Sequence, residues 1–592
     1  MRKDSPFHIM FSEKYNPYFW ISLLALFLYP QTIYFDYIGL DDSTLIVANY
    51  PFIKEFSHIL DAFRHDVFYV PGDSGVEAYY RPILTLTFML ESHIGGISPR
   101  FYHLMDIFYH TSAAILLFKF LTRLRCKKDP AFLLTVLFTV HPIATSVVSW
   151  ITCRNESLLA IFILLSFIWL IDFIEQNSKI ALLCHILFFT IALFTKETAL
   201  AFVPLFLMFI YLFKWESTPG SLNPSYFKKA VLTFSLLVVI VSWFTIRQRV
   251  LHNPDMTVIY IIKSIFRNLP AIIPYLGKVL LPVNLSVYPT MADTKFVYGF
   301  ITLALTVAGV FLSKGKRPLF VLFGVVWFLL SLIPSLVRMH SGADADHFME
   351  HRLYLPLIGF LIIAIEVDII KYFSFNNAKV VLTCGLIVVV FFAITFVHAR
   401  CYRNGIIFYR SAVATSPHAA FLRVELAKEY FALGKNNLAE EELIKAVTLN
   451  PSVEGLQIDP GIGYGAGNQV KFVRFQTIKF YKMVASAYAK VNNNNSAFSY
   501  YIKALVEDPG NVETLKDLGD FLMSVGRDND AVKVFDKELY LKPNNREYLI
   551  NKGKALQNLG KCDEAVRCFK DALLSGPILK GMLNKSCRAS LF

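Results

Sequence analysis

Residues 36–110 read DYIGLDDSTLIVANYPFIKEFSHILDAFRHDVFYVPGDSGVEAYYRPILTLTFMLESHIGGISPRFYHLMDIFYH, and they lie between the first two long apolar segments of the chain. Two adjacent carboxylates, Asp41 and Asp42, follow the first apolar segment directly. Ionisable residues held between membrane segments are candidates for chemistry, because they are costly at membrane depth. Asp42 before Ser43 also suits an ordinary helix N-cap, so both interpretations stay open here. Between Phe52 and Phe63 apolar residues recur at helical spacing, which predicts a short amphipathic helix, packed either on the membrane surface or against the spans.

The composition around this stretch is that of a membrane protein. The chain has 592 residues, of which 55% are hydrophobic and 17% are charged, whereas charged residues usually make up about 25%. The deficit falls on residues 18–400, a succession of apolar runs, while residues 420–592 have an ordinary polar composition. We therefore expect an all-α protein in which a transmembrane domain, residues 1–400, precedes a separate polar domain.

Eleven apolar runs are long enough to cross a bilayer, some of them with tilt. They lie near residues 18–35, 101–122, 131–150, 157–173, 180–195, 198–213, 229–246, 298–313, 318–336, 353–372 and 379–398. Residues 247–297 are interrupted by prolines and basic residues, which favours an interfacial helix pair or a re-entrant hairpin over a crossing. Alternate counting then places four Lys- and Arg-rich clusters on one side, which the positive-inside rule assigns to the cytoplasm.

The opposite, external side collects ionisable residues from the first external loop (residues 36–100) and from the rims of several other spans. They are Asp41, Asp42, Arg81, Arg154, Glu156, Lys196, Glu197, Asp344, Asp346, His347, Glu350, His351 and Arg352. A carboxylate here suits a general base on an acceptor hydroxyl, and arginine and lysine bind phosphate. Together with spans that admit a lipid tail, these groups predict sugar transfer from a polyprenyl-phosphate carrier. The alternative is a set of ion pairs that ties short loops together.

Metal and nucleic-acid partners have weaker support. Oxygen and nitrogen ligands for a divalent ion such as Mg²⁺ or Mn²⁺ are present at five positions, but their spacing defines no site: Asp41, Asp42, Asp344, Asp346 and His347. No other cofactor is expected. The net charge of +13 is explained by loop lysines and arginines that orient the spans, so no nucleic-acid partner is predicted. The eight cysteines show no zinc-type pairing.

A period of 34 residues organises the C-terminal part. Pro509, Pro543 and Pro577 are 34 residues apart, and Pro451 precedes Pro509 by 34 residues plus a 24-residue insertion. Between these prolines, small residues alternate with bulky ones at fixed positions, as in Gly519 and the later Phe535. This is the tetratricopeptide pattern, and it predicts four helix pairs in residues 420–592, stacked into a superhelix. The glycine-rich insertion, residues 453–477, is expected to form a loop, and residues 401–419 a linker.

A series of motifs recurs through the membrane part. They are LDD at 40–42, YYRPILTLTF at 79–88, FYHLMDIFYH at 101–110, VHPIATSVVSWITCRNE at 140–156, FTKETAL at 194–200, LLPVNLS at 280–286 and EHRLYLPLIGF at 350–360. In this order they resemble the GT-C superfamily of glycosyltransferases, and within it the transmembrane and tetratricopeptide-repeat O-mannosyltransferases and their bacterial relatives. The resemblance covers most of residues 36–360.

The resemblance implies inverting transfer of a sugar, with mannose as the candidate, from a lipid phosphate to an acceptor such as a protein hydroxyl. It implies a catalytic base in the first external loop, where Asp41 and Asp42 both match and Asp42, farther from the membrane edge, is favoured. Recurring charged positions that would bind substrate or phosphate are matched by Arg81, Arg154, Lys196, Glu197, Glu350 and Arg352. The family commonly has Gly-Arg where this chain has Cys153-Arg154, and Glu156 keeps the acid that often follows.

The predicted topology places the repeats on the same external side as the acidic loop, where they would present an acceptor polypeptide or dock a partner. We expect a bacterial inner membrane with periplasmic repeats, or else an endoplasmic-reticulum membrane with lumenal repeats. Sequons matter only in the second case, and they occur at Asn155, Asn284, Asn494 and Asn584. A non-catalytic membrane-anchored repeat scaffold for envelope complexes is the main alternative function. A lipid-linked glycan transporter ranks third, because no inverted halves are visible.

Overall fold

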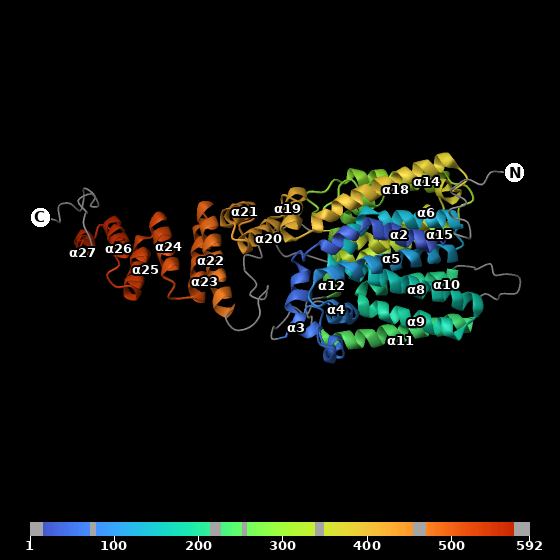
Figure 1. Ribbon diagram of the computed structural model, residues 1–592, viewed down its shortest axis with the longest axis horizontal. Helices are drawn as coiled ribbons and strands as arrows, with labels where there is room; N and C mark the ends of the chain where they lie inside the picture. The colour runs from blue at the N-terminus through green and yellow to red at the C-terminus, as the bar shows by residue number, and fades with distance from the viewer. Residues whose placement is uncertain are drawn as a thin grey trace. The chain divides into compact units, whose positions relative to one another are not determined.

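The computed structural model describes residues 16–71, 79–212, 226–251, 257–337, 348–453 and 469–573. Across these ranges the regular secondary structure is helical throughout, which confirms the predicted all-α class. The chain divides into two compact units (Figure 1). Of the described residues, those up to His418 belong to the first unit and those from Ala419 onward to the second.

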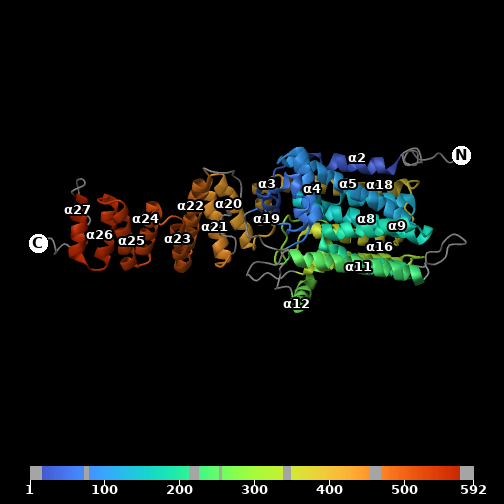
Figure 2. The ribbon, with the colours of Figure 1, turned by 90° about the horizontal axis from the view of Figure 1, so that it is seen from below.

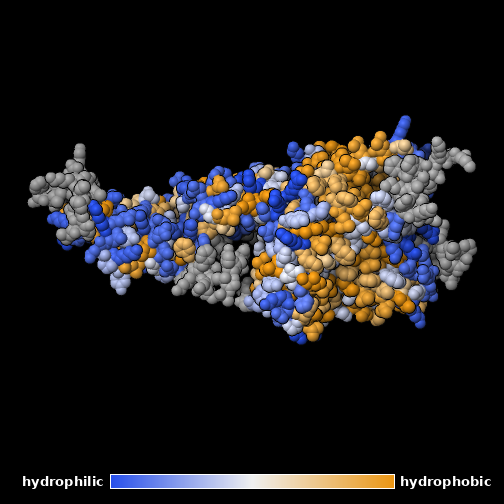
Figure 3. All heavy atoms as spheres, in the orientation of Figure 1, coloured by the Kyte–Doolittle hydropathy of each residue, from blue (hydrophilic) through white to orange (hydrophobic). Residues whose placement is uncertain are grey.

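The first unit is a bundle of apolar helices that lie side by side in both ribbon views (Figures 1 and 2). An apolar band covers the face of these helices seen in Figure 3. The α-helices are α2 (Pro17–Leu28), α3 (Tyr50–Ile53), α4 (Pro82–Gly95), α5 (Pro99–Arg123), α6 (Lys128–Val140), α7 (Thr145–Ser149), α8 (Asn155–Gln176), α9 (Lys179–Thr195), α10 (Val203–Leu212), α11 (Tyr226–Val250), α12 (Val258–Asn268), α13 (Ile272–Leu280), α14 (Val297–Leu312), α15 (Pro318–Leu332), α16 (Tyr354–Ala364), α17 (Asp368–Lys371), α18 (Ala378–Ala399) and α19 (Gly405–Thr415).

Five helical segments are long and apolar enough to cross a membrane: Pro99–Arg123, Ile151–Gln176, Tyr226–Val250, Pro318–Leu336 and Ala378–Tyr402. A sixth arises if α6 and the helix after it, bent by 46°, form one span. Several other predicted spans correspond to shorter apolar helices. The first span, predicted over residues 18–35, is an α-helix only to Leu28, because Pro30 starts a 3-10 turn. The chain is a membrane protein, and the number of eleven crossings stays a prediction.

The two ends of the bundle differ in their ionic contacts. At one end Arg123 pairs with Asp172 and Glu175, and Arg317 donates two hydrogen bonds to the Glu366 carboxylate, at 2.8 and 2.6 Å. The Arg317 side chain also reaches the Leu124 carbonyl at 3.4 Å, so these loops share one end. The opposite end holds the described part of residues 36–100, which the sequence predicts as the first external loop, and the starts of α8, α10 and α16. Contacts of Arg81 with Glu197, Lys196 with Glu156 and Cys153 with His351 join these segments.

The segment between α11 and α14 stays at the end that holds the first external loop. α11 begins beside the end of α10, where the Tyr211 and Thr233 hydroxyls lie 3.2 Å apart, and it runs toward the opposite end. α13 then packs on the start of α14, where a Cβ added to Gly277 would lie 2.7 Å from the Gly299 nitrogen. α12 and α13 therefore both lie at this end of the bundle, and a segment that does not cross the membrane between α11 and α14 stays a prediction.

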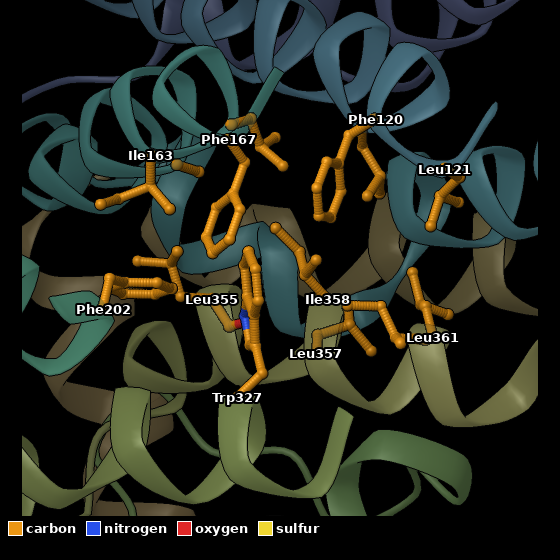
Figure 4. Packing of buried hydrophobic residues seen from close by; sticks show 14 of the residues in the cluster. Phe120, Leu121, Ile163, Phe167, Phe202, Trp327, Leu355, Leu357, Ile358 and Leu361 are labelled. Carbon is orange, nitrogen blue, oxygen red and sulfur yellow. The ribbon is translucent and has the colours of Figure 1, made fainter. Parts of the chain in front are cut away.

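Aromatic packing around Trp327 fixes the core of the bundle (Figure 4). The Trp327 indole nitrogen donates to the Leu355 carbonyl at 2.9 Å, and its ring stacks on Phe167 with centroids 5.1 Å apart. α15 and α16 approach closely at Gly359, where an added Cβ would lie 2.6 Å from the Phe328 nitrogen. This contact places the start of α16, and the charged residues just before it, against α8 and α15.

The predicted amphipathic helix between Phe52 and Phe63 is not formed. α3 ends at Ile53, Glu55 adopts an extended conformation, and 3-10 turns follow at Phe56–His58 and Asp61–Phe63. Phe52 is buried and stacks on the His58 ring with centroids 4.8 Å apart. The helical spacing in the sequence therefore reflects local packing of short turns, so the prediction of one continuous helix is wrong.

The second unit contains four helix pairs in its described residues. The helices are α20 (Ala420–Ala432), α21 (Asn436–Leu449), α22 (Gln469–Lys490), α23 (Asn494–Glu507), α24 (Val512–Ser524), α25 (Asp528–Leu541), α26 (Arg546–Asn558) and α27 (Cys562–Leu573). Each pair turns through one residue with positive φ, at Gly434, Asn492, Gly526 and Gly560. A Cβ on Gly553 would lie 2.6 Å from the Phe569 ring, so small residues let each pair close, as the pattern predicts.

The borders of the second unit differ in detail from those read in the sequence. The predicted linker, residues 401–419, contains α19, whose Phe408 and Tyr409 are buried in the first unit. Residues 454–468, the centre of the predicted insertion, lie outside the described residues, and α22 already begins at Gln469.

Candidate active site

Asp41 and Asp42 lie in a tight turn, and their carboxylates have different environments. Gly39 and Leu40 have φ of 80° and 49°, a left-handed conformation that is unusual for leucine. Asp42 is 1% exposed, and its carboxylate accepts hydrogen bonds from the backbone nitrogens of Ile38 and Thr152, each at 3.3 Å. Asp41, one residue earlier, is exposed. Burial raises the pKa of Asp42 to about 7, although the two backbone donors oppose the rise.

Arg154 lies in the interior, enclosed by carboxylates. Its side chain is fully buried and pairs with Glu91 and, at 2.8 Å, with Asp106. It also donates to the Tyr102 carbonyl at 2.9 Å, and the Tyr109 hydroxyl donates to Glu91 at 2.8 Å. The predicted phosphate ligand Arg154 is thus the centre of a buried network joining α4, α5 and the start of α8.

Two predicted binding residues on the rim form a pair with each other. Arg81, just before α4, donates from Nε to Glu197 Oε2 at 3.0 Å and from Nη2 to Glu197 Oε1 at 2.5 Å. Lys196, next in the chain to Glu197, pairs with Glu156 at the start of α8. These contacts tie the first external loop, α8 and the turn before α10 together.

Glu350 is the centre of a third ionic group, just before α16. Its carboxylate pairs with Lys278 of α13 at 2.5 Å, accepts the Ser286 backbone N–H at 2.8 Å, and lies 3.6 Å from His398 Nε2. Burial opposes ionisation of Glu350, but Lys278 and His398 outweigh it and hold its pKa below the ordinary value. Glu350 therefore has the contacts of a structural anion, although the sequence suggested a binding role.

Arg352 differs from the other predicted cations. Its side chain is partly exposed and donates to the Ser335 carbonyl at 3.2 Å, beside Tyr275. Among the residues that the structure describes, no carboxylate pairs with Arg352. In this part of the chain Arg352 thus differs from Arg81, Arg154 and Lys196, each of which pairs with a carboxylate.

Cys153 connects these groups at one end of the bundle. The charges of Asp41, Asp42, Glu156 and Lys196 all act on its thiol, and its sulfur lies 3.4 Å from His351 Nδ1. These ionisable residues, which come from several separate segments of the sequence, therefore lie at the same end of the bundle, as predicted. Asp344, Asp346 and His347 lie outside the described residues. Within the described part of the chain, no group of three His, Cys, Asp or Glu side chains is placed to hold a metal ion.

Sequence reasoning missed the buried partners of two predicted site residues, Arg154 and Glu350. Glu91, Asp106 and Lys278 complete the buried networks, yet each stands alone within an apolar stretch of sequence. Their occurrence within apolar stretches could have identified them, because an ionised side chain buried among apolar helices requires a charged or hydrogen-bonding partner.

Comparisons with known proteins identify a repeat family and several relatives. A tetratricopeptide-repeat model matches residues 422–453, which include most of α20 and all of α21. Protein O-mannosyl-transferase F38B6.6 of Caenorhabditis elegans is 27% identical over 437 residues, covering 70% of this chain and 60% of that protein. Protein O-mannosyl-transferase TMTC2 of Mus musculus is 34% identical over 148 residues, covering 24% of this chain and 17% of that protein. The chain thus matches less than two thirds of the length of these relatives.

A crystal structure of MamA is 22% identical and covers 29% of this chain and 85% of that one, with a TM-score of 0.19. The alignment with the Caenorhabditis elegans protein is longer than the second unit and therefore includes the membrane part, whereas the repeat model matches the second unit. The chain is therefore a relative of the TMTC protein O-mannosyl-transferases.

Proposed function

We propose that this protein is a membrane glycosyltransferase that moves a sugar, with mannose as the candidate, from a polyprenyl-phosphate donor to a hydroxyl of a protein acceptor. The relatives named protein O-mannosyl-transferase support the reaction class. The observation that carries the proposal is the exposed carboxylate of Asp41, next to the buried Asp42, at the end of the bundle where Lys196 acts on Cys153. Cys153 in turn contacts His351, the residue before Arg352.

Asp41 is the better candidate for the catalytic base, although the sequence favoured Asp42. A base must come within hydrogen-bond distance of the proton that it removes. The Asp42 carboxylate is buried and already accepts two backbone hydrogen bonds. We assign Asp42 the role of holding the turn that presents Asp41.

In the proposed reaction the acceptor hydroxyl gives its proton to the Asp41 carboxylate while its oxygen attacks the anomeric carbon of the sugar. The bond between that carbon and the phosphate oxygen breaks, and the polyprenyl phosphate leaves with the electron pair. Attack from the face opposite the phosphate inverts the configuration. Arg352, which pairs with no carboxylate among the described residues, would stabilise the charge on the departing phosphate.

The second unit suits the supply of a polypeptide acceptor. Four helix pairs of tetratricopeptide type form a stack with an extended surface. Cys562 of α27 is disulfide-bonded, and disulfides persist in oxidising spaces such as the periplasm or the endoplasmic-reticulum lumen. This favours placing the repeats on the external side of the membrane, in either of the two predicted compartments.

The test is transfer of labelled sugar from a panel of polyprenyl-phosphate donors to a hydroxyl-bearing peptide by the purified full chain in lipid nanodiscs. Asp41→Asn should lower the rate about 100-fold or more, since general-base catalysis supplies about that much. Arg352→Gln should lower it too. Asp36→Asn is the matched control, because Asp36 is an exposed acid of the same loop.

Equal transfer by Asp41→Asn and the unaltered chain would remove Asp41 as the base. Loss of transfer in Asp42→Asn alone, with the fold intact, would restore the choice that the sequence favoured. If a folded chain transfers no sugar from any donor while its repeats capture a polypeptide, the scaffold function replaces the enzyme.

A further inference from the structure

α12 carries an apolar face that the rest of the described chain leaves uncovered. Val258, Ile262 and Phe266 follow one another at intervals of four residues, so they form one stripe along the helix. Their exposed fractions are 71%, 48% and 69%. Exposed apolar residues on a helix that also carries charge are characteristic of helices at a membrane interface.

A second face fixes α12 to the bundle. Ser264 is fully buried, and Ile265 packs against the main hydrophobic core. The Asn268 side chain donates to the Leu336 carbonyl, at the end of the segment that continues α15, at 2.9 Å. α12 is therefore a fixed part of the first unit, and its exposed stripe has a defined direction.

The third face is basic. Lys263 and Arg267 are four residues apart and both exposed, and Arg249 is exposed at the end of α11 just before. No acidic residue occurs in Val258–Asn268. Positive side chains beside an exposed apolar stripe match a surface that offers apolar chains and negative headgroups together, as an anionic bilayer does.

The position of α12 fits that surface. Figure 2 shows α12 crosswise at the C-terminal end of α11, the long green helix. α11 itself exposes apolar residues along its length, including Phe234, Val241 and Phe244. The uncovered face of α12 thus continues the apolar surface of a candidate span at the depth where the span ends.

We propose that α12 lies in the plane of the membrane interface, at the end of the bundle that holds Asp41. Its Val258–Ile262–Phe266 stripe is buried among acyl chains, and Lys263 contacts the phosphate groups of anionic lipids. The anchor fixes the depth of the acidic pair relative to the bilayer. The proposal does not depend on the transfer reaction.

The test uses the full chain in nanodiscs and two neighbouring positions that face different ways. Ile262→Trp and Lys263→Trp each add one fluorophore, and the unaltered chain supplies the background of native tryptophans. With acyl-chain brominated phosphatidylcholine, quenching of the added signal should be about threefold stronger in Ile262→Trp than in Lys263→Trp. Aqueous iodide should quench Lys263→Trp more strongly.

A second measurement addresses the lipid charge. Spin labels on phosphatidylglycerol headgroups should quench the fluorescence of Ile262→Trp about twice as strongly as the same labels on phosphatidylcholine headgroups. In the double variant Ile262→Trp with Lys263→Gln, the two labelled lipids should quench equally. Equal headgroup quenching would overturn the anionic contact. Strong iodide quenching of Ile262→Trp without quenching by brominated lipid would overturn the anchor and mark the stripe as a surface for a protein partner.

Discussion

Arg81 and Glu197, 116 residues apart in the chain, form a two-pronged ion pair at the rim of the bundle. The guanidinium also lies over the Tyr79 ring, 4.3 Å from its centroid. The neighbouring Lys196 pairs with Glu156 at the start of α8. Lys196 and Glu197 therefore each form an ion pair with a different segment of the bundle. Two residues that the sequence predicts as substrate ligands therefore hold the first external loop in place.

The Arg81–Glu197 pair should be strongly coupled. Arg81→Lys keeps the charge but loses the forked geometry, and Glu197→Gln keeps the shape but loses the charge. Each change should lower the thermal midpoint of the chain in detergent, and the double variant should lose little more, with a coupling energy of about 1 kcal/mol or more. Additive losses would show that the two side chains act independently.

Arg154→Ala should destabilise the bundle more than any rim substitution. It leaves Glu91 and Asp106 buried without their cation, and removing one partner of a buried pair costs about 3–5 kcal/mol. The expected result is loss of folded protein in size-exclusion chromatography. Arg64→Ala is the control, because Arg64 pairs with Asp61 on the surface and should change stability by less than about 0.5 kcal/mol. A folded, stable Arg154→Ala chain would contradict the buried network.

Asp42 should make stability fall as pH rises. Its pKa is raised from 3.8 to about 7 in the folded chain, so between those values the unfolded chain binds fewer protons than the folded one. Rising pH across this window therefore favours unfolding, and the effect is complete above about 7. The unaltered chain should lose more thermal stability between about pH 5 and pH 8 than Asp42→Asn does. Parallel pH profiles of the two chains would count against the burial of this carboxylate.

Gly519→Ala should destabilise the repeats. A Cβ at this position would overlap the Phe535 ring of the paired helix, and overpacking of this kind costs about 1–3 kcal/mol. Gly510→Ala is the matched control, since the nearest atom to its Cβ is 3.7 Å away. Hydrogen exchange of α24 and α25 peptides in the full chain should rise only in the first variant. Unchanged hydrogen exchange in Gly519→Ala would show that the Phe535 ring can move away from the added Cβ without loss of stability.

Asn494 reports the side of the membrane on which the repeats lie. It is exposed and begins α23 within a sequon. If the chain resides in the endoplasmic reticulum with lumenal repeats, Asn494 should carry a glycan that a glycosidase removes and Asn494→Gln lacks. Buried Asn155 should stay unmodified. An unglycosylated Asn494 in a eukaryotic host that glycosylates a lumenal reporter fused to the C-terminus would contradict accessibility of this site.

The repeats show how much spacing alone can predict. A 34-residue period placed Gly519 opposite Phe535 and Gly553 opposite Phe569, and both contacts are present. Each pair depends on residues close in the sequence, so the pattern carries most of the information about its packing. The motif order in the membrane part likewise led to the TMTC relationship that the comparisons support.

The sequence by itself determined the helical class, the two-part organisation into apolar and repeat segments, and the identity of the charged residues at the rims, because these follow from local periodicity and composition. Only the tertiary structure decided which carboxylate is exposed. Asp41 and Asp42 are neighbours in the chain, yet Thr152, 110 residues away, supplies a backbone donor that draws Asp42 inward. Pairing partners such as Glu91 for Arg154 were likewise decided by the fold, since a buried charge must meet its counterion wherever the chain brings one.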